Sequence, residues 1–364
     1  MLTDSARSAR RFLIPPLIAC TMTLIWPGLV RADEIRDAQW HLPFLGISQA
    51  FGHSRGLGIT IAEIDSGVDA THPDLRGAIA PGVAIDRPGD GREDPDGHGT
   101  FVAGLIAARG RSGMAGAIGV APESTLFPVS VPDEGVEPAA RAIDIAISKR
   151  VGVICMALAF GGRQILEDAV RRAQDADIVV VAGAGNRPTV GVQAPARYPG
   201  VVAVVGVDKD GNHADISVTG PEAMLAAPAI EIVSTVAGGG YGKNSGTSDA
   251  TAIVAGVAAL VRSKFPQLSA REVIHRMTAT AIDKGKPGRD DEYGYGIVNP
   301  VGALTADVPP LSESQSSSPA PPSIGAQPKP DNKGSSAALG WLIGAVLLAA
   351  AGTGAAIAIR RARR

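Results

Sequence analysis

The sequence predicts an α/β fold with a mostly parallel central sheet, and two patterns carry this prediction. The candidate strands are mostly unbroken apolar runs, which suit a sheet that is covered on both faces. Helical patterns separate these runs, so successive strands are expected to run parallel and to connect through right-handed crossovers. Ligand sites in such a fold lie at the carboxyl ends of the strands.

The predicted elements alternate along one large domain, residues 59–308. The predicted strands are Ile59–Ile64, Thr125–Val129, Val151–Met156, Ile178–Ala182, Val201–Val207 and Glu231–Thr235. The predicted helices are Thr100–Arg109, Pro138–Lys149, Leu166–Ala176, Asp249–Phe265 and Ala270–Ala281. No internal repeat interrupts the alternation.

The composition is that of a globular protein whose core is built from small aliphatic residues. Hydrophobic residues make up 45% of the 364 positions and aromatic residues only 4%, so Ala, Val, Ile and Leu must fill the core. The net charge is −2, and no basic stripe interleaved with aromatics occurs, which argues against a nucleic-acid partner. One of the two cysteines, Cys20, lies in a predicted signal peptide, so Cys155 has no partner for an internal disulfide in the mature chain.

The N-terminus has the three parts of a secretory signal peptide. Three arginines precede the apolar stretch Phe12–Leu29, and Val30-Arg31-Ala32 fits the small-x-Ala cleavage pattern. We therefore predict a signal peptide over residues 1–32; an uncleaved anchor is the alternative, which the prolines in the stretch disfavour. Residues 33–58 form an N-terminal extension, too short to fold alone, that we expect to stay attached and to pack on the domain.

The C-terminus predicts a single membrane span. Residues 337–359 are free of charge and would form a helix about 34 Å long, enough to cross a bilayer. Four arginines follow in residues 360–364, which places this tail in the cytoplasm and the domain outside. Residues 309–336 are rich in Pro and Ser and predict an extended stalk.

Two chemically competent side chains lie at the ends of predicted elements. Asp65 directly follows the strand Ile59–Ile64, and His98 lies between Gly97 and Gly99 at the start of a helical pattern. The glycines leave the imidazole uncovered, as a general base requires, and a carboxylate would hold it in one tautomer. Taken singly, Asp65 also fits a turn residue and His98 a capping residue.

Two further residues suit nucleophilic catalysis. Ser248 lies at the start of the predicted helix Asp249–Phe265, where the macrodipole and free N–H groups favour a developing oxyanion. Asn186 follows another buried strand and offers a side-chain amide as a second donor. Taken singly, Ser248 also fits an N-cap and Asn186 a turn. Together with an aspartate and a histidine they predict an activated serine.

The four motifs, in the order Asp, His, Asn and Ser, resemble those of the subtilisin family of serine proteases. The order of the triad separates this family from chymotrypsin-like and α/β-hydrolase enzymes. The resemblance covers residues 59–305, including the closing segment Tyr293–Asn299. It implies a three-layer subtilisin-like fold and a triad with an oxyanion-hole residue, namely Asp65, His98, Ser248 and Asn186.

The order of segments resembles the mycosins, membrane-anchored proteases associated with type VII secretion. A signal peptide, the lead-in Gln39–Leu42, the protease domain, a Pro-rich stalk and a terminal span follow one another in both. The resemblance implies a serine endopeptidase on the outer face of the cell membrane that cleaves exported proteins or loops of the secretion machinery. The alternative is a structural component of the secretion complex whose protease site is slow or dispensable.

Three positions depart from the family pattern. Ala252 stands where many relatives have proline, which leaves the first turn of the nucleophile helix less fixed. Asp249, directly after Ser248, suits the helix dipole but adds negative charge near the oxyanion. The third position is Ala159, which replaces a glycine in the segment that, by resemblance, binds substrate backbone. The resemblance assigns substrate binding to Ala157, Leu158, Ala159 and Gly183.

No metal or other cofactor is expected. The histidines outside the triad lack metal-ligand spacing, and no compact Asp-x-Asp-x-Asp loop typical of calcium sites occurs. The acidic segment Asp90–Asp96 is interpreted as a solvated loop.

Overall fold

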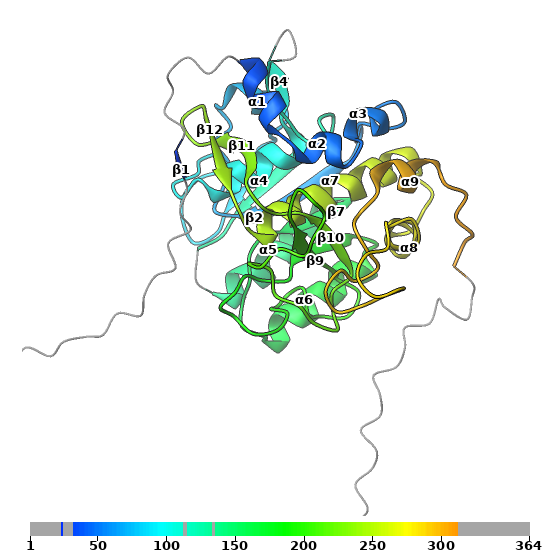
Figure 1. The fold of residues 1–364 in the computed structure, drawn as a ribbon. Coiled ribbons are helices and arrows are strands. Elements are labelled where there is room, and N and C mark those ends of the chain that lie inside the picture. The colour runs from blue at the N-terminus through cyan, green and yellow to red at the C-terminus, as the bar shows by residue number, and fades with distance from the viewer. Residues whose placement is uncertain (1–22, 25–31, 112–114, 133–134, 312–364) are drawn as a thin grey trace, which may run out of the picture. The chain divides into compact units, whose positions relative to one another are not determined.

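A seven-stranded sheet forms the centre of the domain (Figure 1). The structure, a computed structural model, describes residues 23–24, 32–111, 115–132 and 135–311. The predicted membrane span and basic tail lie outside these residues, as do most of the predicted signal peptide and stalk. None of the helices in the described residues is long and apolar enough to cross a bilayer.

All neighbouring strands of this sheet pair in parallel, in the order β10-β9-β8-β7-β2-β6-β3. The strands are β2 Thr60–Asp65, β3 Val83–Ala84, β6 Thr125–Ser130, β7 Val153–Met156, β8 Val179–Gly183, β9 Val202–Val207 and β10 Leu225–Pro228. Every residue of β7, β8 and β9 is buried. Because both faces of these strands are covered, their sequences are unbroken apolar runs rather than alternating ones.

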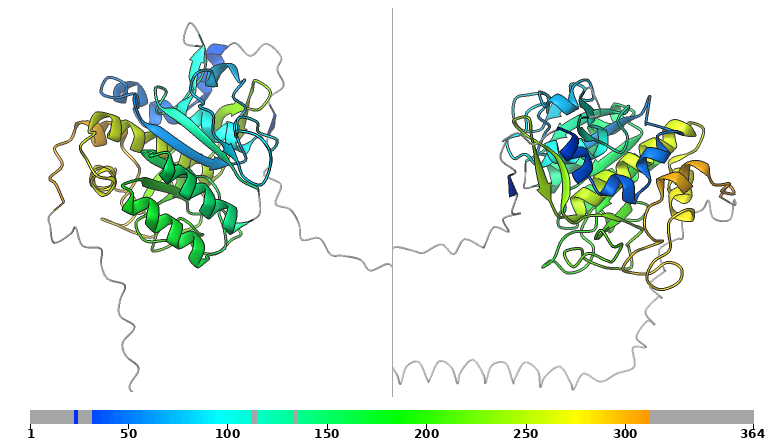
Figure 2. Two further views of the ribbon diagram at one scale, coloured as in Figure 1. Left: turned by 180° about the vertical axis from the view of Figure 1, so that it is seen from behind. Right: turned by 45° about the horizontal axis from the view of Figure 1, so that its top comes forward.

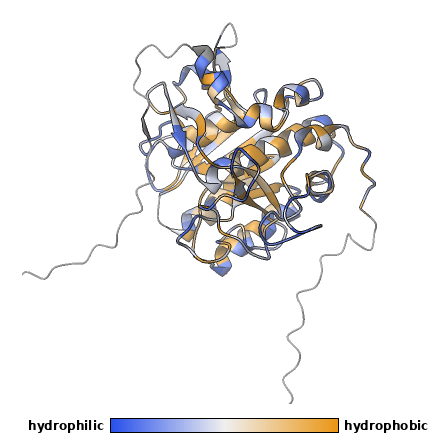
Figure 3. Cartoon of the chain, viewed as in Figure 1, coloured by the Kyte–Doolittle hydropathy of each residue, from blue (hydrophilic) through white to orange (hydrophobic). Residues whose placement is uncertain are grey.

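Helices cover both faces of the sheet, which confirms the predicted α/β architecture. One face is packed against α4 and α7, and the other against α5 and α6 (Figure 2). The longer helices are α4 His98–Ala107, α5 Val136–Ser148, α6 Gln164–Asp175, α7 Thr247–Lys264 and α8 Ala270–Ala279; a short α9, Pro300–Thr305, follows. Hydrophobic residues concentrate in the strands and in the helical faces against them (Figure 3), and α7 is buried from Thr247 to Val261.

One predicted strand belongs to a different sheet. The run predicted at Glu231–Thr235 forms β11, Ile232–Val236, which pairs antiparallel with β12, Gly240–Asn244, outside the parallel sheet. β12 in turn pairs with β1, Thr23–Leu24. The sequence did not predict β12, since three of its five residues are Gly or Lys, which have low strand propensity. A second antiparallel pair joins β4, Arg109–Arg111, to β5, Ala115–Ile118.

The N-terminal extension packs on the domain through three short helices. These are α1 Ala32–Ala38, α2 His41–Phe44 and α3 Ile47–Ala50. Gln39 is fully buried; its amide donates to the carbonyl of Ile118 at 3.1 Å and accepts from the same residue's N–H at 2.9 Å. The Trp40 indole donates to the carbonyl of Ile230 at 3.1 Å. The extension is therefore joined to both β5 and the segment before β11.

Candidate active site

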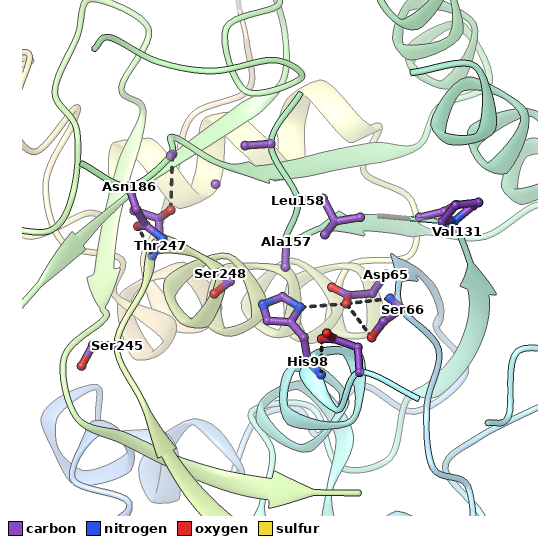
Figure 4. Close-up of a pocket in the computed structure, with 15 residues that line it drawn as sticks. Asp65, Ser66, His98, Val131, Ala157, Leu158, Asn186, Ser245, Thr247 and Ser248 are labelled. Atoms are coloured by element: carbon purple, nitrogen blue, oxygen red, sulfur yellow. Dashed lines mark hydrogen bonds and ion pairs between the residues drawn. The ribbon is translucent and has the colours of Figure 1, made fainter. Parts of the chain in front are cut away.

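Asp65 and His98 meet where β2 ends and α4 begins. The Nδ1 atom of His98 lies 2.8 Å from Oδ1 of Asp65, and the carboxylate is 1% exposed. The same oxygen accepts from the backbone N–H of Ser66 at 2.8 Å. Because the aspartate holds Nδ1, the Nε2 edge of the imidazole is left to face the cleft (Figure 4).

Two glycines allow this approach of strand and helix. A β-carbon on Gly99 would lie 2.0 Å from the carbonyl oxygen of Gly67, closer than any real contact. The N–H of Gly99 also donates to Oγ of Ser66 at 3.0 Å. The flanking glycine that leaves the imidazole uncovered therefore also brings the aspartate and the histidine together.

Asp94 fixes the start of α4, a role that the sequence analysis missed. One oxygen accepts from the Ser66 hydroxyl and the Gly97 N–H, both at 2.8 Å, and the other accepts from the Thr100 N–H at 2.7 Å. Asp94 is therefore not a solvated residue of an acidic loop but a carboxylate that caps a helix N-terminus. Its place a few residues before a helical pattern is the signal that could have revealed it.

Ser248 and Asn186 border one small space beside the imidazole. Ser248 is the second residue of α7, and Asn186 follows the end of β8. The side-chain oxygen Oδ1 of Asn186 accepts from the backbone N–H of Thr247 at 3.0 Å, which orients the side-chain amide nitrogen. A β-carbon on Gly246 would lie 3.1 Å from Ser248 Oγ and 3.3 Å from Asn186 Nδ2, so glycine keeps this space open.

All eight residues predicted for the site line the same cleft, whose volume is about 280 Å³. Figure 4 shows Ser248 on the side of the imidazole away from Asp65. The sequence analysis gave no site role to the seven other lining residues, which are Ser66, Asp96, Val131, Pro132, Gly185, Ser245 and Thr247. Most of these lie on loops after strands, where only the folded chain reveals their proximity.

Charges around the cleft favour a protonated imidazole. Burial lowers the pKa of His98, but the charge and hydrogen bond of Asp65, with the charges of Asp249 and Asp96, outweigh it and raise the pKa to about 9. Burial raises the pKa of Asp249 to about 7, against a hydrogen bond from Asn244 and the charge of His98. The described residues contain no cluster of three or more His, Cys, Asp or Glu side chains placed to hold a metal ion.

A serine hydroxyl at a helix N-terminus, next to an imidazole held by a buried carboxylate, is the arrangement of serine hydrolases. The comparisons with known proteins narrow the class. The profile of the Subtilase family matches residues 56–296, and the chain belongs to this family of serine proteases.

Relatives and solved structures agree with this assignment. The thermostable alkaline protease of Halalkalibacterium halodurans is 41% identical over 268 residues, which are 71% of this chain and 72% of the relative. Subtilisin of Bacillus pumilus is 39% identical over 271 residues, 70% of this chain and 96% of the relative. The structure of the MycP3 protease from the type VII (ESX-3) secretion system has a TM-score of 0.67 at 34% identity and covers 74% of this chain and 88% of its own.

A second solved structure is similar to this chain in fold and sequence. It is that of the serine protease MycP1, described as an essential component of the type VII (ESX-1) secretion system. Its TM-score is 0.68 at 30% identity, and the match covers 79% of this chain and 92% of that chain. The predicted likeness to subtilisins and to mycosins is thereby confirmed.

Proposed function

We propose that the chain is an endopeptidase that cleaves peptide bonds through Ser248, His98 and Asp65. The observation that carries the proposal is the 2.8 Å contact between His98 Nδ1 and Asp65 Oδ1 in the cleft that Ser248 also lines. Ser248 attacks the scissile carbonyl carbon, and Nε2 of His98 takes the hydroxyl proton and then gives it to the leaving amine. Asp65 keeps the imidazole in the required tautomer and stabilises the imidazolium.

The oxyanion of the tetrahedral intermediate is stabilised by two donors. These are the side-chain amide of Asn186 and the backbone N–H of Ser248 at the positive end of α7. The hydrogen bond from the backbone N–H of Thr247 to the side-chain oxygen of Asn186 supports this role, because it turns the NH₂ group toward the space beside Ser248. Loss of such a donor typically costs about 3 kcal/mol in the transition state.

We further propose that the enzyme acts outside the cell membrane, anchored by residues 337–359, and that it is associated with type VII secretion. The charge-free length of that segment and the arginines after it support the anchor and its orientation. The likeness to MycP3 and MycP1, proteases of type VII systems, supports the association. Substrates would then be exported proteins or loops of the secretion machinery.

A second role, as a structural component of the secretion complex, has one observation in its favour. The related MycP1 is described as an essential component of its secretion system. A protein that serves as a structural component does not need to hydrolyse peptides quickly. Both roles can belong to one protein. The protease role requires an activated serine, whereas the structural role does not.

The test is labelling of the full-length, detergent-solubilised protein with a fluorophosphonate probe, which reacts with activated serines. We expect the wild type to label and the Ser248→Ala and His98→Ala variants to lose labelling. Ser245→Ala is the matched control, because Ser245 lines the same cleft and its hydroxyl accepts from the Glu231 N–H; this variant should label normally. A folded wild type that does not label would contradict the protease proposal and leave the structural role.

A further inference from the structure

Apart from His98, the ionisable side chains that line the cleft are acidic. Among the described residues, Asp65 and Asp96 line it together with His98, and no Lys or Arg does so. Asp65 is buried and bound to the imidazole. Asp96 is exposed, so its carboxylate is the lining charge that a bound peptide can reach.

The orientation of Asp96 is set by the catalytic helix itself. Its Oδ1 accepts from the backbone N–H of His98 at 3.2 Å. No Lys or Arg in the described part of the chain forms an ion pair with it: Arg92 pairs with Asp90, and Arg87 donates to the carbonyl of Ser66 and to Ser130. Among the described residues, the carboxylate that faces the cleft therefore has no Lys or Arg paired with it.

The pKa of His98 indicates that the electrostatic potential in this part of the cleft is negative. Burial lowers its pKa, yet the charges of Asp65 from β2, Asp249 from α7 and Asp96 from the turn before α4 together raise the pKa to about 9. These carboxylates therefore stabilise a positive charge on the imidazole ring although burial opposes it. A cationic group of a substrate that enters the cleft experiences the same negative potential.

The wall of the cleft also suits a long cationic side chain. Val131, Pro132 and Leu158 give the cleft an apolar lining next to its carboxylates, and Figure 4 shows Leu158 and Val131 on the side of the imidazole where Asp65 lies. Lys and Arg bury an aliphatic stem against apolar surface while their charged end reaches a carboxylate. A glutamate or aspartate of a substrate would meet like charge in the same place.

We propose that Asp96 is a specificity-determining residue that selects peptides with Lys or Arg within two residues of the scissile bond. The inference rests on the proposed protease function and names its substrate class. Arg is favoured over Lys if its fork binds both oxygens of the carboxylate.

The test uses the full-length protein and a set of fluorogenic peptides that differ at one position, with Arg, Lys, Gln or Glu placed in turn at each of the three residues before and after the cleaved bond. Rates are compared as ratios of kcat/KM between peptides measured with the same variant at the same pH, so that the protonation state of the imidazole cancels in each ratio. We expect Arg and Lys to exceed Gln by about tenfold at one position near the bond and Glu to be the poorest. Raising the salt concentration should reduce the preference.

The decisive variant is Asp96→Asn, which retains an oxygen to accept from the His98 N–H but removes the charge. We expect it to lose the preference for Arg and Lys, measured within the variant as the ratio of kcat/KM for the Arg or Lys peptide to kcat/KM for the Gln peptide. Asp90→Asn is the matched control, since Asp90 is an acidic residue of the same loop that does not line the cleft; it should retain the preference.

The outcomes separate the inference from the function on which it rests. A protein that labels with fluorophosphonate and cleaves all peptides equally, or that retains the cationic preference in Asp96→Asn, overturns the inference and leaves the protease intact. A folded protein that neither labels nor cleaves overturns both. Cleavage with a preference that Asp96→Asn alone removes supports both.

Discussion

At the scale of single residues, Asp249 is a second carboxylate that acts on His98, the proposed general base. It is fully buried; its Oδ1 accepts from the Asn244 amide at 3.0 Å, and its Oδ2 has no hydrogen-bond partner among the described residues. The sequence places this charge beside Ser248 but does not give the sign of its effect. The structure does, because the negative charge raises the pKa of His98.

We predict that Asp249→Asn moves the acid limb of the pH profile of kcat/KM to lower pH. His98 acts as a base only when neutral, and its pKa, raised to about 9 in the wild type, falls when one of the nearby anions is removed. The variant should therefore keep more of its plateau activity at pH 7 than the wild type does. An acid limb at the same pH in both proteins would show that Asp249 has only a packing role.

Site residues that lie in a recognisable local motif could be predicted from the sequence. Residues whose role depends on contacts made only in the folded chain could not. Asp65, His98, Asn186 and Ser248 stand out because each lies at the end of a strand or the start of a helix in a recognisable motif. The sequence alone predicts that Asp94 and Asp96 both belong to one solvated acidic loop. Their roles depend on which atoms of β2 and α4 lie nearby, and local sequence does not carry that information.

At the scale of elements, the contact between the end of β2 and the start of α4 sets the catalytic geometry. We predict that Gly99→Ala lowers the fluorophosphonate labelling rate about 100-fold, because the new methyl group must push α4 away from Gly67 and so lengthen the contact between His98 and Asp65. Overpacking of this kind also destabilises a fold by about 1–3 kcal/mol, which thermal unfolding would measure.

The control for this variant is Gly161→Ala. A β-carbon on Gly161 would meet no atom within 4 Å, so this variant should label and unfold as the wild type does. If Gly99→Ala labelled at the wild-type rate, the close approach of the two glycines would not be what positions the histidine.

Most of the central elements were predictable because their signals are local. Strands β7, β8 and β9 are continuous apolar runs, and α6, the helix between β7 and β8, buries one apolar face. The assignment of β11 to an antiparallel pair was not predictable, since an apolar run does not identify its partner strand. β10 escaped prediction because its four residues, LAAP, include no β-branched side chain.

At the scale of the whole molecule, buried ionisable groups make stability depend on pH. His41 is fully buried, neither ring nitrogen has a hydrogen-bond partner among the described residues, and burial lowers its pKa to about 3. The unfolded chain takes up a proton at this histidine below about pH 6.5, whereas the folded one does not. The contribution of His41 is therefore fully present above pH 6.5 and is lost as the pH falls toward 3.

We predict that lowering the pH from 6.5 toward 3 destabilises the wild type relative to His41→Leu, because only the wild type must keep a buried histidine neutral in the folded state. The linked free energy is about 5 kcal/mol over that range, which urea unfolding at several pH values would detect. His53→Leu, at an exposed histidine, is the control and should leave the slope unchanged. An equal slope in His41→Leu and wild type would contradict the prediction.

Glu63 contributes with the opposite sign. It is 1% exposed, and burial, with the charges of Asp65 and Asp94, raises its pKa well above the ordinary value. Its contribution is fully present below the pKa of the unfolded chain and is lost as the pH rises through the folded value. The comparison of His41→Leu with wild type cancels this term, because both proteins retain Glu63.

The position of the N-terminal extension determines whether it could inhibit the protease. The side chains of Gln39 and Trp40 donate hydrogen bonds to the carbonyls of Ile118 and Ile230, and none of the described residues from 34 to 58 lines the cleft. Removing this segment would therefore unblock nothing and would strip hydrogen-bond partners from Ile118 and Ile230. In this respect the extension differs from the inhibitory segment of a zymogen, and its contacts with the domain agree with the expectation that it stays attached.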